Sequence, residues 1–230
     1  MPIRSHYRLL CGDCLDVLPT LPNNRLYAVV TDPPYNVGLG YNSKDDNKAD
    51  YEIWCRQWFT QLSQLCRGPI LISCGVANLG TWHRIKNPRW VLCWWKPASS
   101  GRCTVGFNNW EPILLYNAKL ARVVCDVIRT TEQASLPARH KNEAVRHPCP
   151  KPLEWAIKQI VMLPDECVVL DPFMGTGTTG VACARFGRGR GTCTADDRPS
   201  CPIAQVGPSA PHGCAPECAD RRHRPADPGV

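Results

Sequence analysis

Two short apolar runs, each ending in an Asp-Pro pair, constrain the fold of this chain more than any other feature. Residues 26–31 lead into an Asp-Pro-Pro-Tyr segment at residues 32–35, and residues 167–170 lead into a Gly-rich segment at residues 171–177. Short apolar runs that stop at turn-forming residues are typical of buried strands. Open α/β sheets bind their ligands at the carboxyl ends of such strands. The two runs therefore predict an α/β sheet with a ligand site built from the two loops.

The Asp-Pro-Pro-Tyr segment carries groups that suit methyl transfer to an amino group on a nucleobase. The lone pair of that nitrogen is delocalised into the ring, so it attacks poorly unless acceptors engage its hydrogens and stabilise the developing positive charge. Asp32 supplies a carboxylate and Pro33 a backbone carbonyl, and Pro33 and Pro34 together stiffen the turn. Tyr35 supplies a flat face on which an extruded base can stack. The alternative is a strand-ending turn without chemistry, because proline and aspartate also favour turns.

The Gly-rich segment has the composition of a loop that lies close to a ligand. Gly175 and Gly177 permit backbone angles that other residues avoid, and they allow close approach. Thr178 and Thr179 can begin the helix that follows, whose amino terminus suits a carboxylate such as that of a methionine moiety. Gly-rich turns after strands also serve nucleotides or close packing, but no Gly-Lys-Ser/Thr follows, so the loop is not a phosphate-binding P-loop.

Together the two segments resemble those of the DNA methyltransferases that methylate amino groups with S-adenosylmethionine. The order matches the circularly permuted class, in which the catalytic tetrapeptide precedes the cofactor loop. Two further segments fit: residues 10–18 resemble the opening strand and turn, with Asp13 in the position that contacts the cofactor adenine, and residues 147–152 resemble the His-Pro-…-Lys-Pro segment that lines the cofactor site. The resemblance covers about residues 7–187 and implies a doubly wound, mixed sheet with the Rossmann-like methyltransferase fold.

The resemblance also implies the roles of individual residues. Catalysis would fall to Asp32, Pro33, Pro34 and Tyr35. S-adenosylmethionine would be bound by Asp13, Lys151, Asp171, Phe173, Gly175, Gly177 and Thr178. The implied partner is double-stranded DNA with the target base flipped out, with a cognate restriction enzyme as a companion and the enzyme itself a monomer or homodimer.

Composition agrees with this interpretation. The net charge of +7 suits an anionic partner, and no apolar stretch is long enough to span a membrane, so we expect a cytoplasmic protein. The fifteen cysteines lie mostly within predicted strands and helices, where free cysteine behaves as a small buried hydrophobe. No set of them has the spacing of a strong metal site, so we predict no metal.

The chain divides into a catalytic domain and an atypical tail. Strand-like and helix-like segments alternate over residues 1–187, and a helix is predicted over residues 51–66. Residues 97–147 are predicted to form a small insertion that contacts DNA, because cations outnumber anions there. Residues 188–230 are rich in Pro, Cys, Arg and Ala and are predicted to be disordered. Relatives usually have an apolar strand there, ending in an acid that binds the cofactor ribose; Asp196 and Asp197 are weak substitutes.

Three functional hypotheses follow. The first is methylation of adenine N6 in DNA. The second keeps the machinery and changes the acceptor to cytosine N4, an RNA base or an amide, although N4 enzymes usually carry serine where this chain has Asp32. Cytosine-C5 chemistry would need a Pro-Cys nucleophile, and Pro148-Cys149 lies in the segment already explained as a helix entrance. The third is an inactive, truncated methyltransferase remnant, which the abnormal tail suggests.

Overall fold

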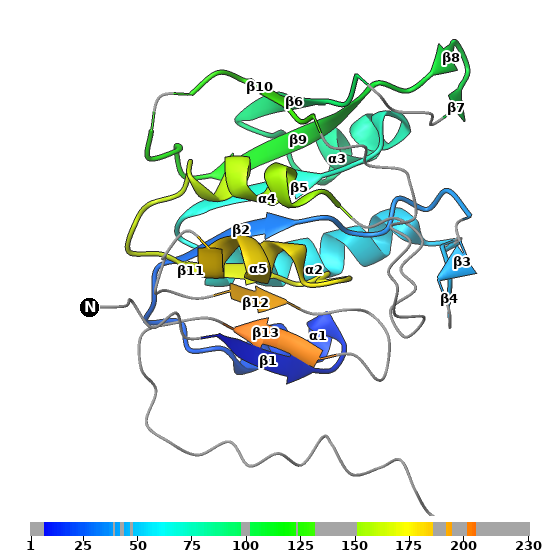
Figure 1. Cartoon of the computed structure of the whole chain (residues 1–230). Coiled ribbons are helices and arrows are strands. Elements are labelled where there is room, and N and C mark those ends of the chain that lie inside the picture. The colour runs from blue at the N-terminus through cyan, green and yellow to red at the C-terminus, as the bar shows by residue number, and fades with distance from the viewer. Residues whose placement is uncertain are drawn as a thin grey trace, which may run out of the picture.

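The computed structural model describes residues 7–38, 40–41, 44–46, 48–97, 102–122, 124–131, 151–185, 192–194 and 202–205. Its centre is a seven-stranded sheet with the order β10-β6-β9-β5-β2-β11-β12 (Figure 1). These strands are β2 (Tyr27–Thr31), β5 (Pro69–Ser73), β6 (Trp90–Trp95), β9 (Trp110–Asn117), β10 (Val127–Arg129), β11 (Val168–Asp171) and β12 (Thr192–Thr194). Both apolar runs predicted as strands are adjacent interior strands of this sheet, β2 and β11.

The sheet is mixed. β9 runs antiparallel to both of its neighbours, β5 and β6, whereas the pairs β2–β5, β2–β11, β11–β12 and β6–β10 are parallel. Val29 of β2 is in register with Ile70 on one side and Leu170 on the other, and all three side chains are fully buried. Strands buried on both faces read as continuous apolar runs, which is why these segments could be identified.

Helices cover both faces of the sheet. One face packs against α2 (Tyr51–Leu65) and α3 (Leu79–Ile85), and the other against α4 (Leu153–Ile160) and α5 (Thr178–Arg185). Successive strand residues point to opposite faces, so Val29 joins the first core and its neighbours Ala28 and Val30 join the second. The predicted doubly wound mixed sheet is therefore confirmed.

The predicted helix over residues 51–66 is confirmed as α2, and its apolar stripe is core. Trp58 is fully buried, and its ring lies edge-on to Phe173 and Trp82 at centroid distances of 5.0 Å and 5.5 Å. Such aromatic pairs contribute about 0.5–1.5 kcal/mol beyond the burial of their surface. The aromatic cluster thereby ties α2 to the loop that follows β11.

Short elements surround the central sheet. They are α1 (Cys14–Val17), the 3-10 turns η1 (Leu18–Thr20) and η2 (Val76–Asn78), and the two-stranded pairs β1 (Arg8–Cys11) with β13 (Pro202–Gln205), β3 (Gly40–Tyr41) with β4 (Lys44–Asp45), and β7 (Arg102–Cys103) with β8 (Gly106–Phe107). Among the described residues no helix is both long and apolar enough to cross a membrane.

The predicted disorder of residues 188–230 is wrong for two stretches. Thr192–Thr194 forms β12, which extends the central sheet beside Val169–Asp171, and Pro202–Gln205 forms β13, which pairs with β1. Backbone hydrogen bonds of a sheet do not depend on side-chain type, so a segment poor in apolar residues can still add strands to an existing edge. The remaining residues of this segment, including Asp196 and Asp197, lie outside the described residues.

These strands predict that the segment supports the fold. A chain ending at residue 191 should lose about 2 kcal/mol of unfolding free energy, which lowers the melting temperature by roughly 4–8 °C for a domain of this size. The reason is that β11 loses its outer neighbour and β1 loses its partner. A chain ending at residue 205 is the control, because it keeps both strands; thermal unfolding of the two truncations and the full chain gives the comparison. Equal melting temperatures would show that β12 and β13 contribute nothing to stability.

Candidate active site

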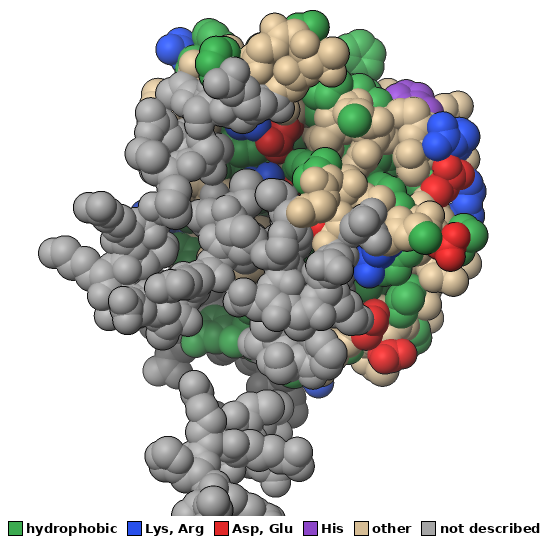
Figure 2. Space-filling model, turned by 90° about the vertical axis from the view of Figure 1, so that its right-hand side faces the viewer, with side chains coloured by type: hydrophobic (Ala, Val, Ile, Leu, Met, Phe, Trp, Pro, Cys, Tyr) green, Lys and Arg blue, Asp and Glu red, His purple; other side chains and the backbone are tan. Residues whose placement is uncertain are grey.

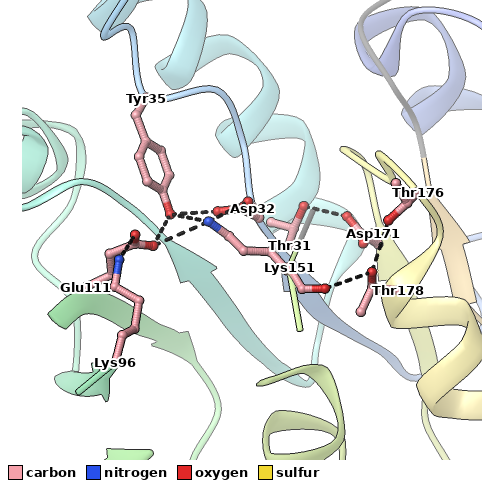
Figure 3. Close-up of polar contacts among 9 residues, drawn as sticks. All are labelled: Thr31, Asp32, Tyr35, Lys96, Glu111, Lys151, Asp171, Thr176 and Thr178. Atoms are coloured by element: carbon pink, nitrogen blue, oxygen red, sulfur yellow. Dashed lines mark hydrogen bonds and ion pairs between the residues drawn. The ribbon is translucent and has the colours of Figure 1, made fainter. Parts of the chain in front are cut away.

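The carboxyl ends of β2 and β11 place the two predicted loops side by side. Thr31, the last residue of β2, donates a hydrogen bond from Oγ1 to Oδ1 of Asp171, the last residue of β11, at 2.8 Å (Figure 3). Both side chains are buried. Figure 2 looks at this edge of the sheet, and acidic, basic and hydrophobic side chains lie close together in a recess near its middle. The structure thus brings the Asp-Pro-Pro-Tyr and Gly-rich segments into one site.

Asp32 is held by two partners within this site. The Tyr35 hydroxyl donates to Oδ1 at 2.6 Å, and the Lys151 ammonium lies 3.0 Å from Oδ2. The Asp32 side chain keeps 22% of its surface exposed. Burial raises the pKa of Asp32; the Lys151 charge opposes that rise, and the charge of Glu111 adds to it. The raised pKa means that ionising the Asp32 carboxyl costs more free energy here than in water.

The rest of the tetrapeptide is fixed through its backbone. The Pro34 carbonyl accepts a hydrogen bond from the Tyr51 hydroxyl at 2.9 Å, and the Tyr35 carbonyl accepts one from Asn78 Nδ2 at 2.6 Å. Pro33 is buried directly after the strand. The Tyr35 ring lies against Gly75, where an added Cβ would stand 3.4 Å from the ring. The loop is therefore rigidly presented, as the two prolines predicted.

The segment after the tetrapeptide is anchored by one carboxylate. The backbone amides of Asn36 and Val37 donate to the two carboxylate oxygens of Asp46 at 2.6 Å and 2.9 Å, and Gly38 N donates to the Asp46 carbonyl at 2.7 Å. Asp46 is buried, and Asn36 takes the left-handed conformation at φ 59°. These contacts fold the chain back toward the site immediately after Tyr35.

Sequence analysis missed a second buried carboxylate, Glu111 on β9. Its Oε2 accepts from the Tyr35 hydroxyl at 3.0 Å and lies 3.3 Å from the Lys151 ammonium, while its Oε1 pairs with Lys96. Burial disfavours the charge, but Lys151 first and then Lys96 outweigh it, so the pKa of Glu111 is lowered. An acidic residue beside an apolar, strand-like run could have indicated Glu111 in the sequence. A strand of this kind carries the carboxylate into the interior, and a buried carboxylate requires a cation as its partner.

The hydroxyl of Tyr35 lies between the two carboxylates. Burial raises the pKa of Tyr35 well above its usual value, and the charges of Asp32 and Glu111 raise it further. The hydroxyl therefore stays protonated and acts as a donor. The Lys151 ammonium lies over the Tyr35 ring and also over the Trp94 ring, at 5.0 Å and 5.3 Å from their centroids.

The Gly-rich loop has the conformation that its glycines predicted. Gly175 and Gly177 both take positive φ, at 53° and 81°, in a region that side chains with a Cβ rarely adopt. Gly177 N donates to the Met174 carbonyl at 2.9 Å, and α5 begins at the next residue, Thr178. The first N–H groups of a helix lack partners within the helix and favour anionic groups. The loop and helix start therefore fit the carboxylate of a methionine moiety.

Two other predicted cofactor residues support this loop from within. Phe173 is buried, its ring packs on Trp54 and Trp58, and its backbone N donates to Asp171 Oδ1 at 3.1 Å. Burial raises the pKa of Asp171 to about 7, although hydrogen bonds from Thr179 and Thr31 lower it. Both side chains thus shape the loop, and their contact with a cofactor stays a prediction.

Lys151 connects the two halves of the site. Its ammonium lies against Asp32, and its backbone carbonyl accepts a hydrogen bond from Thr178 Oγ1 at 3.3 Å. The predicted role of Lys151 was cofactor binding; the structure places its charge on the tetrapeptide side. Asp13 caps α1, accepting a hydrogen bond from Leu15 N at 2.9 Å, and the described contacts do not join it to the other site residues.

Comparisons with known proteins show which proteins the chain resembles in sequence. Residues 82–190 match the DNA methylase family of N6 and N4 methyltransferases. The chain is 25% identical over 215 residues to the type II methyltransferase M.HpaI of Haemophilus parainfluenzae, covering 79% of this chain and 68% of that protein. It is 24% identical to the type II methyltransferase M2.MboI of Moraxella bovis, covering 77% and 79%.

Solved structures share the fold. The cytosine-N4-specific PvuII DNA methyltransferase superposes with a TM-score of 0.63 at 17% identity, covering 83% of this chain and 81% of that one. A complex of M1.HpyAVI with SAM gives a TM-score of 0.57 at 19% identity, covering 83% and 94%. The chain is therefore similar in sequence to DNA methyltransferases over residues 82–190 and beyond, and it shares the fold of these solved structures.

Proposed function

We propose that this chain transfers a methyl group from S-adenosylmethionine to the N6 amino group of adenine in DNA. The observation that carries the proposal is the meeting of two loops at the carboxyl ends of β2 and β11. One presents the Asp32 carboxylate, and the other presents two glycines at positive φ before the start of α5. Lys151 joins the loops through its side chain and its backbone.

Each loop has a separate task in the proposed reaction. S-adenosylmethionine supplies an electrophilic methyl group when bound, and the Gly-rich loop with Thr178 holds its amino-acid end. Asp32 accepts a hydrogen bond from the target amino group, with the Pro33 carbonyl as the second acceptor, so the nitrogen lone pair becomes available. The negative charge of Asp32 also stabilises the positive charge that develops on that nitrogen. Tyr35 supplies the aromatic surface against which the flipped base lies.

Asp32 supports adenine as the target base. In the family that the chain resembles, cytosine-N4 enzymes usually carry serine at this position. The fold does not choose between the bases, because the PvuII enzyme with the same fold is described as cytosine-N4-specific. Cytosine N4 therefore remains the second candidate, and the side chain at position 32 is the reason for placing adenine first.

The proposed substrate is double-stranded DNA with the target base extruded from the helix. We assign the catalytic domain to residues 1–187 in circularly permuted order, with DNA contacts from residues 97–147. Residues 98–101, 123 and 132–147 of the latter range lie outside the described residues. In the described part, Val105 and Phe107 of the β7–β8 hairpin are exposed. We also expect a companion restriction enzyme, as the type II relationship of M.HpaI and M2.MboI supports.

Identification of the methylated base tests the proposal. DNA incubated with the protein and S-adenosylmethionine should yield N6-methyladenine after digestion to nucleosides and mass spectrometry. Asp32→Ala protein should yield about a hundredfold less in the same time, or still less, and serves as the control. N4-methylcytosine in place of N6-methyladenine would make the second candidate correct. Absence of a methylated base together with absence of S-adenosylmethionine binding would instead support the inactive remnant.

A further inference from the structure

Both oxygens of the Asp32 carboxylate are engaged by groups of the chain itself. Oδ1 accepts from the Tyr35 hydroxyl at 2.6 Å, and Oδ2 lies 3.0 Å from the Lys151 ammonium. In the proposed function the same carboxylate must accept a hydrogen of the target amino group. Each oxygen can accept more than one hydrogen bond, so the incoming amino group competes with these two donors for the carboxylate and can displace one of them.

A displaced donor in this site needs another acceptor. The Lys151 side chain keeps only 8% of its surface exposed, and Tyr35 is partly buried. A buried donor that loses its acceptor without replacement costs free energy, and a buried charge costs more. The exchange at Asp32 is therefore easiest if a second acceptor already lies within reach of both donors.

Glu111 is placed to be that acceptor. Its Oε2 lies 3.0 Å from the Tyr35 hydroxyl and 3.3 Å from the Lys151 ammonium, so both donors stand between two carboxylates (Figure 3). The Lys96 ammonium pairs with the other oxygen, Oε1, and fixes the orientation of the carboxylate. Glu111 reaches the site from β9, whereas Asp32 comes from the end of β2, so the two acceptors are held by different strands.

We propose, on the basis of the function above, that Glu111 is a positioning residue that retains the Tyr35 hydroxyl and the Lys151 ammonium while the target amino group occupies Asp32. Without a base, the Tyr35 hydroxyl and the Lys151 ammonium contact both Asp32 and Glu111. When the base binds, these two donors keep their contacts with Glu111 and give up those with Asp32. Glu111 does not touch the base in this scheme. It acts through Tyr35 and Lys151 by making Asp32 available.

The charges around Asp32 set the sign of the expected pH effect. The titratable or charged groups that face it or its partners are Tyr35 on the same loop, Cys74 after β5, Lys96 after β6, Glu111 on β9, Lys151 before α4 and Asp171 at the end of β11. Glu111 raises the pKa of Asp32, and Lys151 lowers it. Removing the Glu111 charge ends its repulsion of the Asp32 carboxylate and leaves the Lys151 ammonium to pair with Asp32 alone. Both effects lower the pKa of Asp32. Its ionised, accepting form then persists to lower pH.

Glu111→Gln is the direct test, measured as single-turnover methyl transfer across a range of pH. The rate constant on the plateau should fall roughly tenfold, the loss expected for one hydrogen bond to a charged group, because Lys151 now competes with the amino group for Asp32. The acid limb of the profile should move to lower pH. Affinity for S-adenosylmethionine should not change, because Glu111 lies on the tetrapeptide side of the site.

Two further variants keep the test decisive. Glu111→Gln leaves Lys96 buried without its carboxylate, so the double variant Glu111→Gln/Lys96→Met removes both charges and should be no slower than the single variant. Glu52→Gln is the matched control, since Glu52 of α2 pairs with Arg56 of the same helix and with Arg84 of α3, both exposed, and should leave rate and pH profile unchanged.

An activity-independent measurement separates this proposal from the proposed function. The carboxyl carbon of Asp32 can be titrated by NMR in protein labelled on aspartate, with the signal assigned by its loss in Asp32→Asn. Glu111→Gln should shift that titration to lower pH even if the wild-type chain methylates no DNA, an outcome that would overturn only the proposed function. An unchanged titration of Asp32 would overturn the role of Glu111. A slower rate with an unchanged acid limb of the pH profile would overturn it as well, because that is the result expected if Glu111 only supports the fold.

Discussion

Asp32→Ala should lower the rate constant of methyl transfer by about a hundredfold or more and leave the affinity for S-adenosylmethionine unchanged. Asp32 directly follows β2 and contacts Tyr35 and Lys151, whereas the Gly-rich loop follows β11. Loss of one well-placed acceptor for a developing charge costs about 3 kcal/mol of transition-state stabilisation. Single-turnover kinetics give the rate constant, and calorimetry gives the affinity.

The fold should tolerate this change. After removal of the Asp32 carboxylate, Lys151 and Tyr35 retain Glu111 as their partner. Asp165→Ala is the matched control, because Asp165 is an exposed carboxylate paired with Arg122 on the surface and should leave the rate unchanged. Wild-type turnover by Asp32→Ala would refute the proposed mechanism. A parallel loss of cofactor affinity would show that Asp32 acts on the cofactor.

Gly177→Val should reduce the affinity for S-adenosylmethionine roughly tenfold or more, and methyl transfer should be lost with it at ordinary cofactor concentrations. The cause is backbone conformation and not space: Gly177 has φ 81°, yet an added Cβ would meet only Met174 Cγ at 4.0 Å. Left-handed backbone costs about 1–2 kcal/mol for residues with a Cβ and is least tolerated by β-branched ones. The loop must therefore rearrange immediately before the start of α5.

Gly180→Val is the control for the second prediction. Gly180 lies within α5, and an added Cβ there meets nothing within 4 Å. The same substitution three residues along the chain should therefore leave cofactor affinity close to that of the wild type. Calorimetric titration of both variants, with circular dichroism to verify folding, gives the comparison. A folded Gly177→Val protein with unchanged affinity would show that this loop does not hold the cofactor.

The strands and loops at the centre of the site could be predicted because their information is local. Residues 26–31 and 167–170 read as buried strands since both faces of β2 and β11 are covered by helices. The positive φ of Gly175 and Gly177 follows from residue type, because glycine alone adopts such angles at little cost. The stripe along α2 was visible at helical spacing for the same reason.

The acidic and basic network around Tyr35 could not be predicted in this way. Glu111, Lys96 and Lys151 lie far apart in the sequence, and no spacing connects them to Asp32. They meet because β9 inserts antiparallel between β5 and β6, which carries Glu111 to the same edge as the end of β2. The strands β12 and β13 were missed for a related reason: an open sheet edge provides backbone partners that no property of the segment itself reveals.

The sequence by itself determined the α/β class, the two loops that bear the proposed chemistry and the conformation of the Gly-rich turn, because each depends on residues close together in the chain. Only the tertiary structure decided that Lys151 directs its charge to Asp32, that Phe173 packs in the core beside Trp58 and that Glu111 shares the donors of Asp32. The physical reason is that a buried charge is stable only beside an opposite charge or a hydrogen-bond partner, and in this site those partners lie on other strands and loops. Which partners they find depends on strand order and direction, and these are set by the packing of the whole domain.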